Sequence, residues 1–330
     1  MASEPVIVVE KLVKKYNGFP ALKGISFKVY EGEVFGFLGP NGAGKTTTIH
    51  ILATVLKPTS GRASVAGYDV VKEAGKVRRT IGIVFQDPSL DDQLTGYENM
   101  YIHGRLYGLR GRVLEERIEE LLRFVELYEY RHRLVKTYSG GMRRRLEIAR
   151  ALLHTPRVLF LDEPTLGLDP QTRAHIWEYI ERMRKEHKVT IFLTTHYMDE
   201  AERLCDRIAI IDHGEIIAVG SPDELKSLVG NDVVYLKLEK MVDDICSLLG
   251  EFSNECRVIG GRVALKVGIA GEAIPRILGE LAKRGISVRE VTYHRPTLND
   301  VFLYLTGREI REESGGFLEF ARMVIRSRRR

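Results

Sequence analysis

The chain has 330 residues, more than one compact domain of ordinary size, so two domains are expected. Its hydrophobic share of 44% and charged share of 29% are typical of globular proteins and exclude a disordered chain. The net charge of +5 is too mild to indicate a nucleic-acid-binding protein. No apolar run approaches the roughly 20 residues that cross a bilayer, and the N-terminus does not resemble a secretory signal. We therefore expect a cytoplasmic protein.

The three cysteines, Cys205, Cys246 and Cys256, are an odd number at spacings that match no zinc-binding pattern. We expect all three to be reduced residues without a special role, as is usual in the cytosol.

Two strands are predicted near the N-terminus, at residues 6–9 and 24–29, with Tyr16 in the loop between them. An aromatic ring at this distance before a nucleotide site could stack on adenine. A surface tyrosine without a role is an equally good interpretation at this point.

Residues 39–46 read Gly-Pro-Asn-Gly-Ala-Gly-Lys-Thr, which matches the G-x-x-x-x-G-K-[ST] pattern of a phosphate-binding loop. The loop follows a strand-like apolar run at 34–38 and precedes a helix-forming run at 47–52. Its glycines let backbone N–H groups curl around a phosphate, and the helix N-terminus adds a positive dipole. Lys45 could reach the β- and γ-phosphates, and the Thr46 hydroxyl could bind Mg²⁺.

The strand predicted at 81–85 ends at Gln86, whose side chain could touch Mg²⁺ or the attacking water, although glutamine is also common in turns. From about residue 94 to 153 the apolar spacing becomes helical. Near the end of this insertion Ser139 is a good N-cap, and Gly140 and Gly141 leave backbone N–H groups open at a helix start. This predicts a second anion-binding site.

An apolar strand at 157–161 leads to two carboxylates, Asp162 and Glu163. Asp162 is placed to hold Mg²⁺ and Glu163 to polarise a water for attack on the γ-phosphate. Asp169 lies in a turn before a helix, and His196 follows the buried strand predicted at 189–195. The carboxyl end of a parallel strand is where α/β sheets gather their ligand contacts.

In this order, the motifs between residues 6 and 228 closely resemble the ATP-binding cassette (ABC) family. The resemblance implies a P-loop NTPase α/β fold with a helical signature subdomain. It implies that Glu163, Gln86 and His196 are the catalytic residues. It also implies that Thr46, Gln86 and Asp162 bind Mg²⁺. The residues that it places around ATP are Tyr16, Gly39, Pro40, Asn41, Gly42, Ala43, Gly44, Lys45, Thr46, Thr47, Ser139, Gly140, Gly141 and Asp169.

The resemblance further implies a head-to-tail dimer, in which each ATP lies between the phosphate loop of one subunit and the signature of the other. We expect the second subunit to be an identical chain. One departure is that the signature here reads Tyr-Ser-Gly-Gly-Met, where the commonest form begins with Leu and ends with Gln. Residues 138–149, 89–99 and 295–302 are similar to the ATPases of daunorubicin/doxorubicin-resistance exporters, which energise a separate permease.

Beyond about residue 230 the pattern becomes strand, helix, strand, strand, helix, strand, and Gly260-Gly261 is a hairpin signal. This order predicts a small α+β, ferredoxin-like accessory domain at 231–306, followed by a basic tail at 307–330. In this domain a short helix is expected at 241–249, and Pro275 is expected in the first turn of a helix at 272–284. A last helix should open at Thr297. A regulatory or assembly-related role and a purely structural role are equally open for this domain.

The tail could form an amphipathic basic helix on a membrane or permease, but a solvated tail is favoured.

We therefore predict residues 1–230 to be an ATP-hydrolysing transport subunit, working with ATP and Mg²⁺. It would be held at the inner face of the cell membrane by a permease, exporting drug-like or lipid-like compounds. The alternative is an ABC-type ATPase acting on ribosomes or nucleic acid. It is disfavoured, and no nucleic-acid partner is expected, because the chain has one phosphate loop and no room for a long coiled coil between residues 46 and 139.

Overall fold

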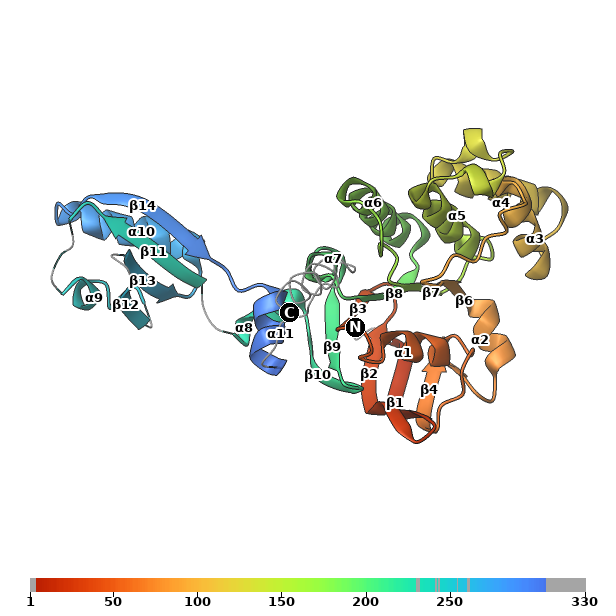
Figure 1. Ribbon diagram of the computed structural model, residues 1–330, viewed down its shortest axis with the longest axis horizontal. Helices are drawn as coiled ribbons and strands as arrows, with labels where there is room; N and C mark the ends of the chain where they lie inside the picture. The colour runs from red at the N-terminus through yellow and green to blue at the C-terminus, as the bar shows by residue number, and fades with distance from the viewer. Residues whose placement is uncertain are drawn as a thin grey trace, which may run out of the picture. The chain divides into compact units, whose positions relative to one another are not determined.

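The computed structural model describes residues 4–229, 232–240, 242, 244–253, 255–259 and 262–306. The chain divides between Pro222 and Asp223 into two compact units (Figure 1). The predicted turn at Gly260-Gly261 and the basic tail at 307–330, for which a solvated tail was favoured over an amphipathic helix, lie outside the described residues. Within the described ranges, no helix is both long and apolar enough to cross a membrane.

A six-stranded sheet in the order β10-β9-β3-β8-β7-β6 forms the centre of the first unit. Its strands are parallel except for β10, which pairs antiparallel with β9. All residues of β3, β7 and β8 are buried, as expected for parallel strands covered on both faces. The strands are β3 (Val34–Leu38), β6 (Ile81–Val84), β7 (Val158–Asp162), β8 (Thr190–Thr195), β9 (Arg207–Asp212) and β10 (Glu215–Gly220).

A second, antiparallel sheet has the order β2-β1-β4-β5. Its strands are β1 (Pro5–Tyr16), β2 (Phe19–Tyr30), β4 (Ser60–Val65) and β5 (Tyr68–Asp69). The prediction of two short strands with Tyr16 in a loop was wrong, because β1 and β2 form one long hairpin. Its two-residue turn is Asn17-Gly18, both with positive φ (48° and 86°), and Tyr16 is the last residue of β1.

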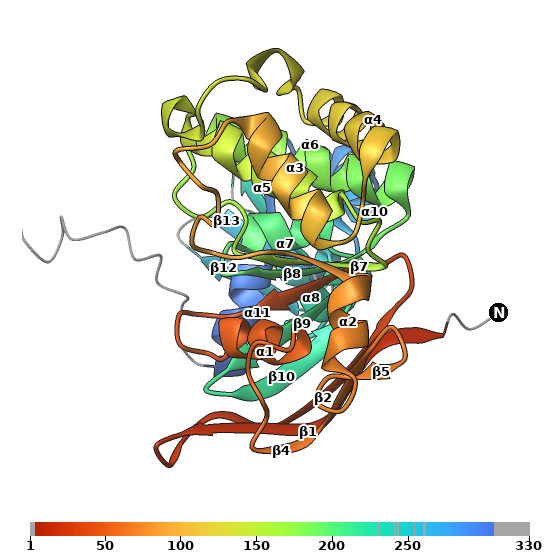
Figure 2. The same ribbon diagram turned by 90° about the vertical axis from the view of Figure 1, so that its right-hand side faces the viewer.

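Helix α1 (Lys45–Leu52) packs against strands of both sheets, whereas α7 (Met198–Leu204) contacts β3 and β8, with α6 (Pro170–His187) packed against α7 (Figures 1 and 2). Between the antiparallel sheet and the central sheet lies an aromatic core with ring centroids 5.4 to 5.9 Å apart. Its rings are Phe27, Phe35, Phe37 and Phe192. This core packs β3 and β8, the middle strands of the central sheet, against the antiparallel sheet.

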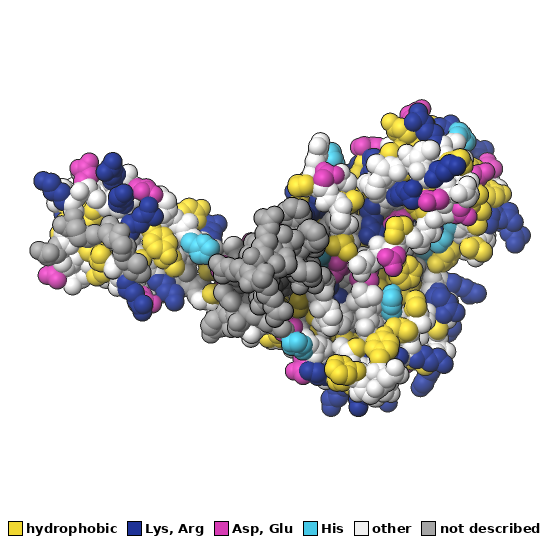
Figure 3. All heavy atoms as spheres, viewed as in Figure 1, with side chains coloured by type: hydrophobic (Ala, Val, Ile, Leu, Met, Phe, Trp, Pro, Cys, Tyr) yellow, Lys and Arg dark blue, Asp and Glu magenta, His cyan; other side chains and the backbone are white. Residues whose placement is uncertain are grey.

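The segment between β6 and β7 is helical, with α3 (Gly96–Leu106), α4 (Gly111–Phe124), the short helices η1 (Tyr128–Tyr130) and η2 (Val135–Thr137), and α5 (Gly140–Leu152). Helix α2 (Ala74–Thr80) precedes β6. A capping box between Thr95 and Glu98 starts α3, and the Ser139 hydroxyl accepts a hydrogen bond from Met142 N to start α5. Figure 3 shows basic and acidic side chains intermixed over these helices, as in the pair Arg112–Glu116.

The second unit contains an antiparallel sheet in the order β12-β13-β11-β14. This order and the sequence of elements confirm the predicted ferredoxin-like α+β arrangement. Alternate residues of β11 and β13 are buried against α10, giving this unit a core of its own. Its elements are β11 (Asp232–Leu238), α9 (Ile245–Leu248), β12 (Glu255–Ile259), β13 (Arg262–Val267), α10 (Ala270–Lys283), β14 (Val288–His294) and α11 (Leu298–Thr306), while α8 (Pro222–Ser227) begins at the boundary.

The cysteine prediction is corrected in this unit, where Cys246 and Cys256 form a disulfide and only Cys205 is a buried free thiol. The ten residues that separate the pair say nothing about their distance in space. Because the chain turns back between α9 and β12, the two Cα atoms lie 5.4 Å apart, within bridging range.

Helix α10 also differs from expectation, since it begins at Ala270 and Pro275 lies inside the helix rather than in its first turn. The Asp232 carboxylate accepts a hydrogen bond from Ala270 N at 2.8 Å, which satisfies a helix-terminal N–H and stabilises the earlier start. Thr297 and Asp300 bond reciprocally at the start of α11, as predicted.

Candidate functional site

The carboxyl ends of the parallel strands bring the predicted site residues to one edge of the central sheet. The register aligns Leu38 of β3 with Thr195 of β8, and Asp162 of β7 with Thr194 of β8. The segments that follow these strands therefore meet there. They surround a cavity of about 570 Å³ lined by Ala21, Asn41, Gly42, Gly44, Lys45, Thr46, Thr47, Gln86, Glu163, Leu166, His196 and Tyr197.

The loop between β3 and α1 closes around the side chain of Lys45, which is only 4% exposed. Its ammonium donates hydrogen bonds to the carbonyl oxygens of Gly39 at 2.7 Å and Pro40 at 3.0 Å. Gly44 has a φ of 109°, and a Cβ there would lie 2.9 Å from the Ala21 carbonyl oxygen. Only glycine fits this position, which lets the backbone enter α1 directly after the loop.

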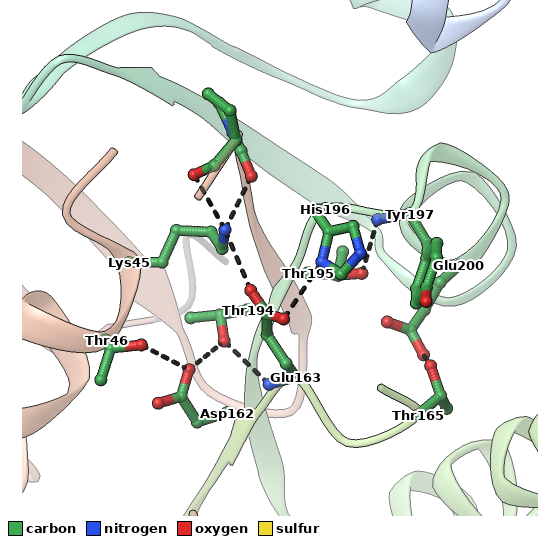
Figure 4. A network of polar contacts seen from close by, with 12 residues as sticks. Lys45, Thr46, Asp162, Glu163, Thr165, Thr194, Thr195, His196, Tyr197 and Glu200 are labelled. Atoms are coloured by element: carbon green, nitrogen blue, oxygen red, sulfur yellow. Dashed lines mark hydrogen bonds and ion pairs between the residues drawn. The ribbon is translucent and has the colours of Figure 1, made fainter. Parts of the chain in front are cut away.

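A chain of polar contacts joins three segments at the cavity (Figure 4). The Lys45 ammonium lies 3.0 Å from Glu163 Oε1, and His196 Nδ1 lies 3.1 Å from Glu163 Oε2. Burial alone would raise the pKa of Glu163, but the hydrogen bond with His196 and the charge of Lys45 lower it below its usual value. Glu163 is therefore ionised at neutral pH.

Asp162 lies beside Glu163 but in a different environment. Its Oδ1 accepts hydrogen bonds from Thr194 Oγ1 at 2.6 Å and from Thr46 Oγ1 at 3.3 Å. Its Oδ2 is buried without a hydrogen-bond partner among the described residues. Burial raises the pKa of Asp162, although the hydrogen bonds from Thr194 and Thr46 oppose the rise. A cation at Oδ2 would favour the ionised form, so Asp162 and Thr46 are the residues suited to hold a metal.

Gln86 is exposed and lies at the same cavity, two residues beyond β6. Tyr16 is 45% exposed and lies outside the set of described residues that line this cavity. Its ring instead has the Lys14 ammonium 5.2 Å from its centroid.

The second predicted anion site lies apart from the first. A smaller cavity of about 220 Å³ is lined by Ser139 and Gly141 at the start of α5 and by Thr172 of α6. The Asp169 carboxylate caps α6 by accepting hydrogen bonds from Thr172 N at 3.0 Å and Thr172 Oγ1 at 2.6 Å. Gly140 begins α5 next to Ser139. Ser139 and Gly141 thus line a hollow separate from the cavity at Lys45, and Asp169 meets this hollow only through its bonds to Thr172.

Sequence reasoning did not identify Thr194, which links the Asp162 carboxylate to the backbone of Glu163. Its hydroxyl donates to Asp162 Oδ1 and accepts a hydrogen bond from Glu163 N at 3.0 Å. The signal was present, because two threonines directly precede His196 at the end of a predicted strand. Threonine is common in strands, so its presence at the end of one does not by itself indicate a site residue.

Two family models match the chain. The model described as "ABC transporter" matches residues 22–166, and the model described as "ATP-binding protein DrrA1-3-like, C-terminal domain" matches residues 220–306. The first covers the phosphate loop, the signature and the two carboxylates. The second covers most of the second unit.

Full-length relatives extend this similarity. The chain is 43% identical over 320 residues to the daunorubicin/doxorubicin resistance ATP-binding protein DrrA of Streptomyces peucetius, covering 95% of this chain and 97% of the relative. It is 38% identical to the linearmycin resistance ATP-binding protein LnrL of Bacillus subtilis, covering 93% and 100% of the two chains. Among solved structures it is similar to cbiO1 from Clostridium perfringens, part of the ABC transporter complex cbiONQ, with a TM-score of 0.64 and 33% identity over 69% of this chain and 94% of that one.

Proposed function

This chain belongs to the ATP-binding proteins of ABC transporters and is an ATPase, and on that premise we propose that it drives a separate membrane permease as an exporter subunit. The observation that carries the site assignment is the buried contact of Glu163 with both Lys45 and His196. It joins the phosphate loop to the ends of β7 and β8 at a single cavity.

Lys45 is proposed to bind the β- and γ-phosphates of ATP. Its ammonium is already held at the mouth of the loop by two backbone carbonyls, so it is oriented before a phosphate arrives. The other nucleotide contacts are proposed to come from the loop backbone of residues 39–47. Tyr16 is retained as the proposed adenine contact.

The residues around Asp162 fit Mg²⁺. Asp162 Oδ2 is a buried oxygen without a partner among the described residues, and Thr46 supplies a hydroxyl within 3.3 Å of the same carboxylate. The described residues hold no cluster of three or more His, Cys, Asp or Glu side chains suited to a metal. This suits an ion that takes one carboxylate plus phosphate and water oxygens, with Gln86 as a further proposed contact. When bound, Mg²⁺ neutralises charge that develops on the transferred phosphate.

Glu163 is proposed to orient the attacking water and to accept its proton. Its lowered pKa keeps it in the basic, ionised form. His196 holds the carboxylate from the opposite side to Lys45, and it is proposed with Gln86 to sense the γ-phosphate. Both line the cavity that contains Lys45.

A second copy of the chain is proposed to complete each ATP site. The start of α5 presents backbone N–H groups near Ser139, Gly140 and Gly141 beside a hollow separate from the phosphate loop. Such a helix N-terminus favours an anion, and the γ-phosphate held by a facing subunit would supply one. Asp169 is proposed to lie at the same interface.

The proposed cargo comes from the relatives, whose names describe resistance to daunorubicin, doxorubicin and linearmycin. On this basis we propose export of drug-like or lipid-like compounds by a permease that holds this subunit at the inner face of the cell membrane.

We further propose that residues 1–230 carry the ATPase, with its helical subdomain at about 94–153. Residues 231–306 are then an accessory domain, followed by the tail at 307–330. We propose no nucleic-acid partner.

The test uses a tagged Glu163→Gln variant loaded with ATP to capture companions from native membranes. The variant should keep ATP binding and lose nearly all turnover, because the base is gone while the Lys45 contact to phosphate remains. A polytopic membrane protein in the eluate is the expected result. Ribosomes or nucleic acid without a membrane protein would overturn the transporter assignment, and hydrolysis at the parental rate would overturn the assignment of Glu163.

A further inference from the structure

The side chain of Arg144 connects helix α5 to the backbone of the hydrolytic site. Arg144 lies five residues beyond Ser139 and is only 7% exposed. Its Nε donates to the carbonyl oxygen of Pro164 at 2.7 Å, and its Nη2 donates to the carbonyl oxygen of Glu163 at 3.2 Å. Two of its donors therefore bind the backbone that carries the proposed base.

The same guanidinium also binds the segment that carries Gln86. Arg144 Nη1 donates to the carbonyl oxygen of Phe85 at 2.7 Å and lies 3.0 Å from Glu147 Oε2. Glu147 Oε1 accepts a hydrogen bond from Ser89 N at 2.7 Å. Phe85 and Ser89 stand on either side of Gln86, so the Arg144–Glu147 pair anchors both ends of this turn.

Burying the charged side chain of Arg144 costs free energy, which a residue that serves packing alone would not require. Burial lowers the pKa of Arg144, with Glu147 opposing the shift, which reflects the cost of removing the charge from water. Buried ion pairs are often no more stabilising than apolar side chains of similar volume. A planar guanidinium, however, has five donors in a rigid fork, and here it binds three carbonyl groups and the Glu147 carboxylate, which is more than the three donors of a lysine ammonium can serve.

We propose that Arg144, together with Glu147, is a positioning residue for ATP hydrolysis, which fixes the backbone of Glu163 and the turn of Gln86 relative to each other. The inference rests on the proposed role of Glu163. Arg144 is not itself one of the residues that line the cavity at Lys45, and among the contacts of the described residues it meets Glu163 at the backbone carbonyl and not at the carboxylate. It acts through Glu163 and Gln86, so its removal should slow hydrolysis and leave ATP binding intact.

The variants are Arg144→Gln and the double variant Arg144→Gln/Glu147→Gln, compared with Glu163→Gln in the full chain. The single variant leaves Glu147 buried and unpaired, so it should also unfold at lower temperature. The double variant removes both charges; Glu147→Gln keeps the shape of its side chain, whereas Arg144→Gln shortens the other and leaves three carbonyl groups without this donor. Displacing a catalytic group by about 1 Å costs about 10²-fold in rate, so kcat should fall by that order with KM for ATP within threefold of the parent.

The matched control is Arg117→Gln. Arg117 of α4 is also a poorly exposed arginine that pairs with a glutamate, Glu120, and donates to an α5 carbonyl, that of Leu152 at 3.2 Å. Among the described residues its contacts are with Glu120 and Leu152 and not with Glu163, so kcat should change less than twofold.

The outcomes separate the two proposals. Loss of kcat in the double variant at unchanged KM and unchanged ATP binding supports positioning, whether or not the three carbonyl groups that lose their donor lower the melting temperature. Parental kcat in the double variant, with Glu163→Gln inactive, would overturn the role of Arg144 and leave the proposed function standing. A joint fall of kcat, ATP binding and melting temperature in the double variant would show a structural role only. Parental turnover in Glu163→Gln would overturn the proposed base, and the inference on Arg144 with it.

Discussion

The Lys45 ammonium and the Glu163 carboxylate lie 3.0 Å apart, and their side chains are only 4% and 6% exposed. The same ammonium binds the Gly39 and Pro40 carbonyls. Lys45, which is proposed to bind the phosphates, is thus paired with Glu163, which is proposed to act on the attacking water. An incoming phosphate must share Lys45 with Glu163, so the two anions compete for one buried charge.

Glu163→Gln should therefore bind ATP more tightly than the parent. The substitution removes a negative charge beside Lys45 and beside the expected position of the γ-phosphate. We expect a dissociation constant about tenfold lower, which corresponds to about 1.4 kcal/mol. Equilibrium dialysis with labelled ATP would measure it, and Glu116→Gln, an exposed carboxylate on α4, is the control. Weaker binding by Glu163→Gln would show that the contact with Lys45 helps to organise the loop instead of competing with phosphate.

Much of this site was predictable because its parts are local patterns. The phosphate loop, Asp162-Glu163 and His196 each follow a buried strand, and parallel strands bring their carboxyl ends together. The contacts of Arg144 were not predictable, because they reach backbone carbonyls 19 to 59 residues away and leave no side-chain signature. The Cys246–Cys256 bridge was missed for a related reason, since pairing depends on how α9 and β12 fold back.

Glu200 is a fully buried carboxylate that sequence reasoning passed over. Glu200 Oε1 accepts hydrogen bonds from Thr165 Oγ1 at 2.7 Å and from Trp177 Nε1 at 2.9 Å. Burial raises the pKa of Glu200, so the neutral form is favoured more than in an ordinary glutamate. Thr165 lies two residues beyond Glu163, which connects this cluster to the candidate site.

Glu200→Gln should cost no more than about 1 kcal/mol in the free energy of unfolding, because an amide oxygen can still accept both bonds. Glu200→Leu should cost about 2–4 kcal/mol, because it leaves two buried donors unpaired. Trp177 is the single tryptophan of the chain, so its fluorescence during urea unfolding reports on this cluster. Equal stability of the Gln and Leu variants would show that the two hydrogen bonds contribute little.

His103 should make the protein less stable as the pH falls. Burial, together with the charges of Arg150 and His154, lowers the pKa of His103 from 6.5 to about 4. Between these values the unfolded chain binds a proton that the folded chain does not, so stability is lost as pH drops from about 6.5 towards 4. The full shift corresponds to at most about 3 kcal/mol, and less after allowance for its partial exposure.

The measurement is the free energy of urea unfolding at pH 7.5 and pH 5 for the parent and His103→Gln. Glutamine does not titrate, so the variant should lose less stability than the parent, by about 1–2 kcal/mol. His132→Gln is the control, because His132 is exposed on the same helical segment. An identical pH dependence in all three proteins would show that His103 takes up its proton without unfolding.

Reduction should destabilise the second unit and leave the first unchanged. The Cys246–Cys256 bridge closes a loop across a sequence separation of 10, for which the loss of chain entropy in the unfolded state corresponds to about 3 kcal/mol. In calorimetry, reductant should move the unfolding transition of the second unit to lower temperature and leave that of the first unit in place. In Cys246→Ala/Cys256→Ala the same transition should already be low and should not respond to reductant.

The state of the thiols checks the bridge directly. Cys205 is buried in the first unit, and burial raises the pKa of its thiol well above the usual value, so it should resist alkylation in the folded protein. Native protein should therefore take up no label, whereas reduced protein should be labelled at Cys246 and Cys256 alone. Labelling of both residues without reductant would mean that the pair is not bridged in solution, and the calorimetric transition should then ignore reductant in the parent as well.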